Sequence, residues 1–113
     1  MRLITGALTT ILATLALAGP ISAATNANTL TGTVGPGFTI TMNKKTVKAG
    51  TYTITIHDQA SIHDFHLTGS GVDKKTSVTG TGTTKWTVKL EKGTYHFVCD
   101  PHRTIMHGVL KVS

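Results

Sequence analysis

Apolar and polar residues alternate with a period of two along much of the chain. The segment "GFTITM" places Phe38, Ile40 and Met42 on one face, and "TYTITIH" at 51–57 and "KWTVKL" at 85–90 repeat the pattern. This period is that of a β-strand with one buried face. No segment after residue 24 has the spacing of an amphipathic helix. The sequence therefore predicts an all-β domain.

Short turn sequences separate the alternating segments. Glycine-containing turns stand at 35–37, 48–50, 69–71, 79–82 and 91–93. Seven to eight short strands with turns at close intervals are typical of a Greek-key β-sandwich. We expect antiparallel strands with one solvated face, and we place Phe38 and Trp86 on core-facing positions.

The first 24 residues have the layout of a secretory signal peptide. Arg2 precedes an apolar run over 3–18, and a Gly-Pro pair and small residues up to Ala24 follow it. The run is diluted by Thr and Gly and is shorter than the roughly 20 residues of a spanning helix, which argues against a membrane anchor. We expect a signal peptide over 1–24, a single domain over 25–113, and export to the periplasm or cell envelope.

The expected mature chain is basic. Without Arg2 it has ten Lys and Arg residues against five Asp and Glu residues. The lysines are scattered and lack interleaved aromatic residues, which argues against nucleic-acid binding and favours a solvated surface. An acidic partner protein also fits this charge. No segment after the expected signal peptide could span a membrane, and we expect a soluble monomer.

The segment "YHFVCDPHRTIMHG" concentrates the chemically reactive side chains at 95–108. It holds the only cysteine, Cys99, with three of the six histidines and one of the three methionines. Cys99 has no partner for a disulfide within the chain, and a free thiol is a liability in an oxidising compartment. A buried inert cysteine is the simplest alternative. The neighbouring histidines and methionine favour a metal ligand instead.

Strand parity sorts the histidines into two groups. In "YHFVC", Cys99 falls on the same strand face as the core-facing Phe97. Upstream, in "HDFHL", His63 falls on the same face as the core-facing Phe65. His66 and Asp64 have the opposite parity. His63 can therefore meet Cys99 at one end of the sandwich, although a bulge would exchange the faces and make His66 the donor. Two further histidines have outward parity: His57 and His96.

The residues after Cys99 complete a set of metal donors. Pro101 sets a turn that returns His102 toward the same end, and Met106 follows four residues later. One thiolate, two imidazoles and a thioether suit copper, because sulfur is soft enough for Cu(I) and imidazole binds Cu(II). Structural zinc sites usually contain more thiolates or histidines and have less use for a thioether. The donor set therefore predicts one copper ion.

The motif "YHFVCDPHRTIM", with "HDF" upstream, resembles the cupredoxin (blue copper) family, which includes plastocyanin, pseudoazurin, amicyanin and azurin. The resemblance covers nearly the whole expected domain. It implies His63, Cys99 and His102 as trigonal copper ligands and Met106 as a weak axial ligand. It also implies that a mononuclear type 1 site cycles between Cu(II) and Cu(I), and that a redox partner protein docks near His102.

Two alternatives concern the fourth ligand and the function. In plastocyanin-like members the methionine lies one position later, where this chain has His107, so His107 is the alternative axial ligand. An envelope protein that delivers copper would need an exposed Met- or His-rich tract, and none is present. A metal-free interaction module would make the Cys-His-Met loop a coincidence. We expect no enzymatic activity, because four protein ligands leave little room for a substrate.

Overall fold

The computed structural model describes residues 28–113, so the expected signal peptide over 1–24 lies outside the described residues. The strands of this part are β1 (Thr29–Val34), β2 (Ile40–Met42), β3 (Thr46–Val47), β4 (Gly50–Asp58), β5 (His66–Gly69), β6 (Val72–Lys75), β7 (Gly82–Leu90), β8 (Gly93–Val98) and β9 (His107–Val112). A short 3₁₀ helix, η1 (Asp100–His102), follows β8. No helix within residues 28–113 is long and apolar enough to cross a membrane.

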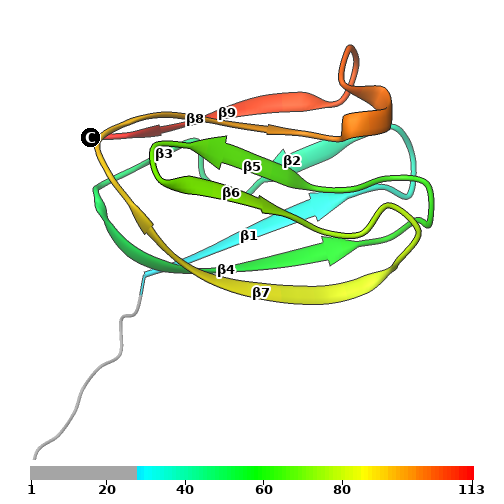
Figure 1. The fold of residues 1–113 in the computed structure, drawn as a ribbon, viewed down its shortest axis with the longest axis horizontal. Coiled ribbons are helices and arrows are strands. Elements are labelled where there is room, and N and C mark those ends of the chain that lie inside the picture. Colours follow the sequence, from blue (N-terminus) through cyan, green and yellow to red (C-terminus); the bar gives the residue numbers. More distant parts are fainter. Residues whose placement is uncertain (1–27) are drawn as a thin grey trace, which may run out of the picture.

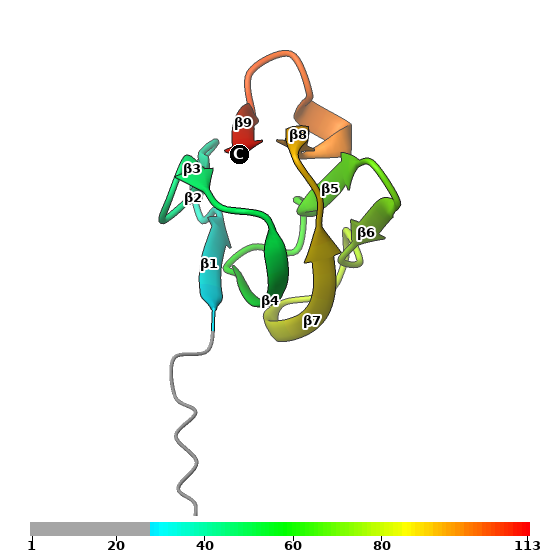
Figure 2. The same ribbon diagram turned by 90° about the vertical axis from the view of Figure 1, so that its left-hand side faces the viewer.

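The strands form two sheets that pack face to face (Figures 1 and 2). One sheet has the order β2-β1-β4-β7 and the other has the order β3-β9-β8-β5-β6. Pairing is antiparallel except between β1 and β4 and between β3 and β9, which are parallel. The predicted β-sandwich is confirmed. The described residues contain nine strands, against the seven to eight expected from the sequence. A strand of two residues, such as β3, is too short to show an alternating pattern.

The core lies between the two sheets and follows the alternation in the sequence. In β4, Tyr52, Ile54 and Ile56 are buried, whereas the threonines between them lie on the outer face and remain partly accessible. From the opposite sheet, Phe97 stacks on Phe65 with ring centroids 5.4 Å apart. Burial of these aromatic and branched side chains is the main favourable term in folding.

One core assignment from the sequence is wrong, at Phe38, whereas Trp86 faces the core as expected but is only partly buried. Phe38 is 56% exposed, because β2 begins only at Ile40 and residue 38 belongs to the turn before it. Trp86 is half-buried and packs against the margin of the core. Its strand, β7, is one of the two edge strands of its sheet, so the Trp86 side chain is not covered on all sides.

The loops that carry the reactive residues gather at one end of the sandwich. Figure 1 shows η1, the β4–β5 loop and the β6–β7 loop at the end opposite the C-terminus. Residues 59–65 and 99–106 therefore lie next to each other, although they are far apart in the sequence. The strand order explains this placement, because β5, which follows the first loop, pairs with β8, which precedes the second.

Candidate metal centre

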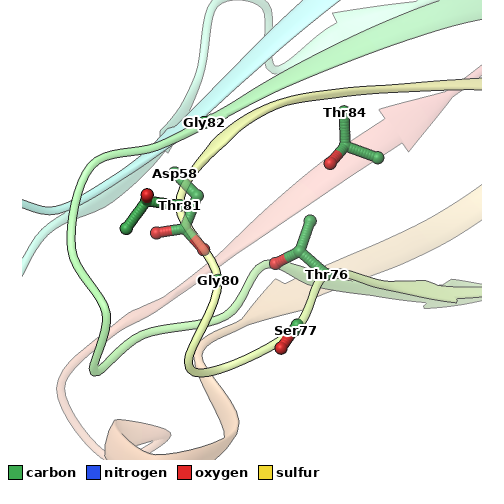
Figure 3. A pocket seen from close by; sticks show the side chains of 7 residues that line it. All are labelled: Asp58, Thr76, Ser77, Gly80, Thr81, Gly82 and Thr84. Atoms are coloured by element: carbon green, nitrogen blue, oxygen red, sulfur yellow. The ribbon is translucent and has the colours of Figure 1, made fainter.

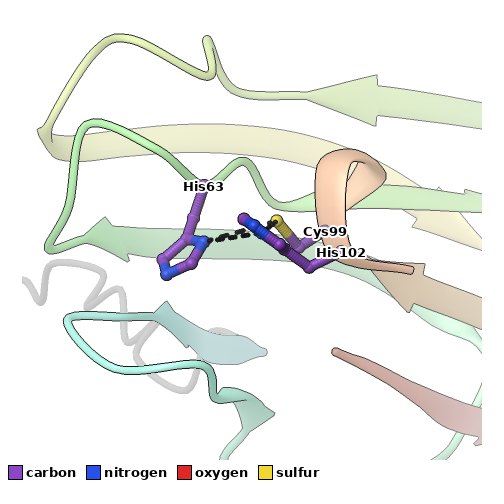
Figure 4. Close-up of side chains that lie close together, drawn as sticks. All are labelled: His63, Cys99 and His102. Carbon is purple, nitrogen blue, oxygen red and sulfur yellow. Dashed lines mark hydrogen bonds between the residues drawn. The ribbon is translucent and has the colours of Figure 1, made fainter. Parts of the chain in front are cut away.

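Three predicted donor residues converge at this end of the sandwich (Figure 4). The Nδ1 atoms of His63 and His102 lie 3.2 Å apart. The Sγ atom of Cys99 lies 3.6 Å from His63 Nδ1 and 3.5 Å from His102 Nδ1. His63 and Cys99 are fully buried, and His102 is half-buried. The three donor atoms form a nearly equilateral triangle.

The size of the triangle fits a bound metal ion. A metal at its centre would lie about 2 Å from each donor, which is close to metal–nitrogen and metal–thiolate bond lengths in proteins. The donor types, two imidazoles and one thiolate, are those that bind copper well. Burial raises the pKa of the Cys99 thiol, and backbone hydrogen bonds from Asp64 and His102 partly offset this effect. A metal cation would favour the thiolate form.

The segment that carries His63 is held by backbone contacts and close packing. The backbone N–H of Phe65 donates to the Thr76 hydroxyl (2.9 Å), and the Phe65 carbonyl accepts from the Thr76 N–H (3.1 Å). Gly35, with φ of 77°, brings its backbone so close to the His63 ring that a Cβ would lie 3.1 Å from Cδ2. The Phe38 ring meets the rings of His63 and His102 edge-on, with centroids 5.4 and 5.0 Å away.

The loop from Cys99 to Met106 is closed by its own backbone hydrogen bonds. The His102 N–H donates to the Cys99 carbonyl (3.0 Å), and the Met106 N–H donates to the His102 carbonyl (2.8 Å). The Cys99 N–H in turn donates to the Met106 carbonyl (3.0 Å). Met106 is fully buried, whereas His107 is exposed at the start of β9. These bonds fix the two ends of the loop beside each other.

Asp64 connects the two donor segments. Its Oδ1 accepts a hydrogen bond from the backbone N–H of Asp100, 2.6 Å away. The expectation that Asp64 faces outward with His66 is wrong, because Asp64 is 1% exposed. Strand β5 begins only at His66, so strand parity does not extend back to residue 64. Burial raises the pKa of Asp64, and its hydrogen bond with the Asp100 side chain acts in the same direction.

His66 belongs to a separate cluster of ionisable side chains. Its Nδ1 lies 2.9 Å from Asp100 Oδ2, and its Nε2 lies 2.7 Å from Asp73 Oδ1. Arg103 donates to Asp100 over 2.7 Å. Burial alone would lower the pKa of His66, but the hydrogen bonds to Asp73 and Asp100 raise it. Sequence reasoning did not find this cluster, because only the pairing of β5 with β6 and β8 brings its members together.

Comparison with known proteins identifies the family. The chain matches the family described as "Copper binding proteins, plastocyanin/azurin family" over residues 21–113. The chain belongs to the plastocyanin/azurin family. Its cofactor is therefore one copper ion, as the sequence predicted. Proteins of this family transfer electrons to redox partner proteins and are not enzymes, so the prediction of a non-enzymatic copper protein is confirmed.

Solved copper proteins share the fold. Auracyanin A, a "blue" copper protein from the green thermophilic photosynthetic bacterium Chloroflexus aurantiacus, is 20% identical, with a TM-score of 0.56, over 78% of this chain and all of that one. Reduced rusticyanin is 24% identical (TM-score 0.59, 75% of this chain and 78% of that one). A Cu(I) amicyanin variant is 19% identical, with a TM-score of 0.56, over 76% of this chain and 83% of that one. A comparison with curated proteins gave no match.

A pocket of about 170 Å³ lies under the β6–β7 loop (Figure 3). It is lined by Asp58, Thr76, Ser77, Gly80, Thr81, Gly82 and Thr84. Asp58 is 6% exposed, and its Oδ1 accepts a hydrogen bond from the Ala60 N–H (3.2 Å). Its Oδ2 is buried and has no protein hydrogen-bond partner among the described residues. Burial raises the pKa of Asp58.

We predict that Asp58→Asn stabilises the protein at neutral pH. A carboxyl group whose pKa is raised by folding favours the folded state below its unfolded pKa, and this contribution is lost as pH rises through the folded pKa. Asn keeps the acceptor for Ala60 and removes the buried charge. We expect a gain of about 1 kcal/mol in the free energy of unfolding at pH 7, which shrinks as pH falls through the raised folded pKa and is largely lost below the unfolded pKa of about 4.

Urea denaturation of the apoprotein at pH 7 and pH 3.5 measures this effect. Glu91→Gln is the matched control, because it removes the same charge from an exposed site that only accepts a bond from the Ser70 hydroxyl. Equal effects of Asp58→Asn and Glu91→Gln at both pH values would contradict a burial cost at Asp58.

Proposed function

We propose that this chain is an exported, mononuclear type 1 copper protein that carries single electrons. His63, Cys99 and His102 are the equatorial ligands. The observation that supports this assignment best is the convergence of their three donor atoms within 3.6 Å of one another, at the buried end of a sandwich of the copper-binding family. His66 is less suited to the role, since both its ring nitrogens face carboxylates.

Met106 completes the proposed ligand set. Its side chain is fully buried, and its backbone bonds to both Cys99 and His102 keep it beside these ligands. The alternative ligand, His107, is exposed. A thioether is the usual weak and long axial ligand of blue copper sites.

The sandwich holds the ligands in one arrangement. Bound copper supplies the chemistry, a one-electron change between Cu(II) and Cu(I). His63 is held by the packing of Gly35 and by the backbone bonds of Phe65, and the loop from Cys99 to Met106 is closed by its own hydrogen bonds. Such a rigid donor set limits the rearrangement that accompanies each change of charge, which favours fast electron transfer.

The partner docks on the exposed apolar surface around His102. Of the ligands, His102 is the one that is not fully buried, and the Phe38 ring lies against it. Ile62 and Ile105 are 50% and 63% exposed on the loops at the same end. The surplus of lysines favours an acidic redox partner. We propose that the mature protein, residues 25–113, acts as a monomer in the periplasm or cell envelope.

Copper reconstitution tests the proposed function. One equivalent of Cu(II) is added to the purified apoprotein, and the visible spectrum is recorded before and after ascorbate. We expect an intense thiolate-to-copper absorption in the visible region, typical of blue copper sites, that ascorbate bleaches and an oxidant restores. A pale complex without this band would refute a type 1 site.

Replacement of Met106 tests the fourth ligand. Met106→Leu preserves apolar volume and costs less than about 1.5 kcal/mol of stability, but removes the thioether. We expect the blue band to persist with a higher reduction potential, because a weak axial donor stabilises Cu(II) more than Cu(I). His107→Leu should leave the potential unchanged. Cyclic voltammetry compares the three proteins, and a shift confined to His107→Leu would assign the axial position to His107.

A further inference from the structure

We propose that His66 is a positioning residue that clamps the ligand loop, residues 99–106, onto the β-sandwich. The inference deepens the proposed function and rests on it for its copper readout. His66 is not one of the proposed ligands, yet its ring makes the contacts that join this loop to a neighbouring strand. No other side chain among residues 28–113 is hydrogen-bonded to both the loop and β6.

The two ring nitrogens of His66 point to different parts of the molecule. On one side, Nδ1 lies 2.9 and 3.1 Å from the two carboxylate oxygens of Asp100, which directly follows Cys99. On the other side, Nε2 lies 2.7 Å from Asp73 of β6. His66 itself starts β5 and pairs with Val98, the residue that precedes Cys99. The ring therefore connects the loop, the central part of the sheet and its edge strand.

The clamp acts at the residue where the loop leaves the sheet. Asp100 is held twice: its N–H donates to Asp64, and its carboxylate faces His66. Arg103 also bonds to the Asp100 carboxylate, but it belongs to the loop and so cannot tie the loop to the sandwich. His66 and Asp64 thus fix the backbone on the C-terminal side of Cys99. Residues that orient metal ligands in this way commonly change metal affinity by about 10- to 100-fold when mutated.

A second metal site is a weaker explanation of the same cluster. Asp64, His66 and Asp100 offer donor atoms within 4.8 Å of one another. However, both nitrogens of His66 already face carboxylates, and the Arg103 guanidinium occupies a position beside Asp100 that a cation would need. The Asp100 carboxylate already has hydrogen-bond partners in His66 and Arg103, so the cluster does not require a metal and fits a structural clamp.

The experiment compares His66→Phe with His96→Phe. His96 is an exposed histidine on β8 of the same sheet and has no hydrogen-bonded side-chain partner in the described part of the chain, so it is a matched control. One readout is the rate at which EDTA removes Cu(II) from the loaded protein. The other is hydrogen–deuterium exchange of the backbone amides of 99–106 in the apoprotein, compared with those of β4. Asp73→Ala, which removes the acceptor for His66 Nε2, is measured in parallel as a milder cut of the same link.

For His66→Phe we expect copper removal and amide exchange of 99–106 each to be about tenfold faster or more, with β4 unchanged. Asp73→Ala should give a smaller acceleration in both readouts, and His96→Phe none. If His66→Phe matches His96→Phe in the loop exchange, the clamp is refuted. If His66→Phe does not fold, Asp73→Ala decides: unaltered loop exchange refutes the clamp. The apoprotein readout needs no copper, so it still tests the clamp if the wild type lacks a blue site.

Discussion

Replacement of Cys99 by Ser is expected to abolish the blue absorption and to weaken copper binding by at least about 100-fold. The band arises from charge transfer between the thiolate sulfur and Cu(II), and a neutral hydroxyl is a far poorer ligand than a thiolate. Cys99 is also the one sulfur donor in the proposed equatorial plane, so no other residue can replace it. The change is measured by visible spectroscopy and by competition with a copper chelator.

The fold should survive this substitution. Cys99 directly follows β8, and its backbone bonds to Met106 and His102 do not involve the sulfur. Far-UV circular dichroism of the apoprotein should match that of the wild type. His57→Ala is the control, because this histidine lies on the outer sheet face and bonds to Thr83, and it should keep full colour. A blue band that persists in Cys99→Ser would exclude Cys99 as a ligand.

Phe65→Ala is expected to cause the largest loss of stability. Phe65 is fully buried, stacks on Phe97 and contacts the edge of Trp86. Truncation of a buried Phe typically costs about 3–5 kcal/mol, from lost burial and from the cavity left behind. Since small domains have only about 5–15 kcal/mol in total, this variant should be close to unfolding. It also lies two residues after His63, so copper binding should weaken.

Guanidinium denaturation of the apoprotein measures this loss. Ile105→Ala is the control, because its side chain is 63% exposed in the ligand loop and its truncation should cost less than about 0.5 kcal/mol. If the Phe65→Ala protein were as stable as the Ile105→Ala protein, burial of the Phe65 ring would contribute little to the stability of the fold.

Strand parity predicted the architecture and the inward-facing residues wherever a regular strand was present. Cys99 directly follows β8, and it is buried as the alternation through Tyr95 and Phe97 predicts. Parity failed outside the strands. Phe38 and Asp64 both precede a strand, so the period of two does not apply to them. Phe38 consequently lies over the imidazole rings rather than in the core.

Contacts between distant segments could not be predicted from spacing. The sequence pattern left His63 and His66 as alternative donors, because they are three residues apart and the start of β5 decides their faces. In the structure, His63 lies against Cys99 and His102, whereas His66 lies between Asp73 and Asp100. The choice depends on the pairing of β5 with β6, whose partners are 3 to 9 positions apart, and with β8, whose partners are 28 to 32 positions apart.

Repeated oxidation and reduction in the presence of a Cu(I) chelator tests most directly whether this protein carries electrons. The copper-loaded protein is reduced with ascorbate and reoxidised with ferricyanide over several cycles, while the chelator reports any released Cu(I). Our account predicts that the blue band returns to its full intensity after each cycle and that the chelator stays free of copper. Transfer of copper to the chelator on the first reduction would contradict it and would indicate a protein that delivers copper instead.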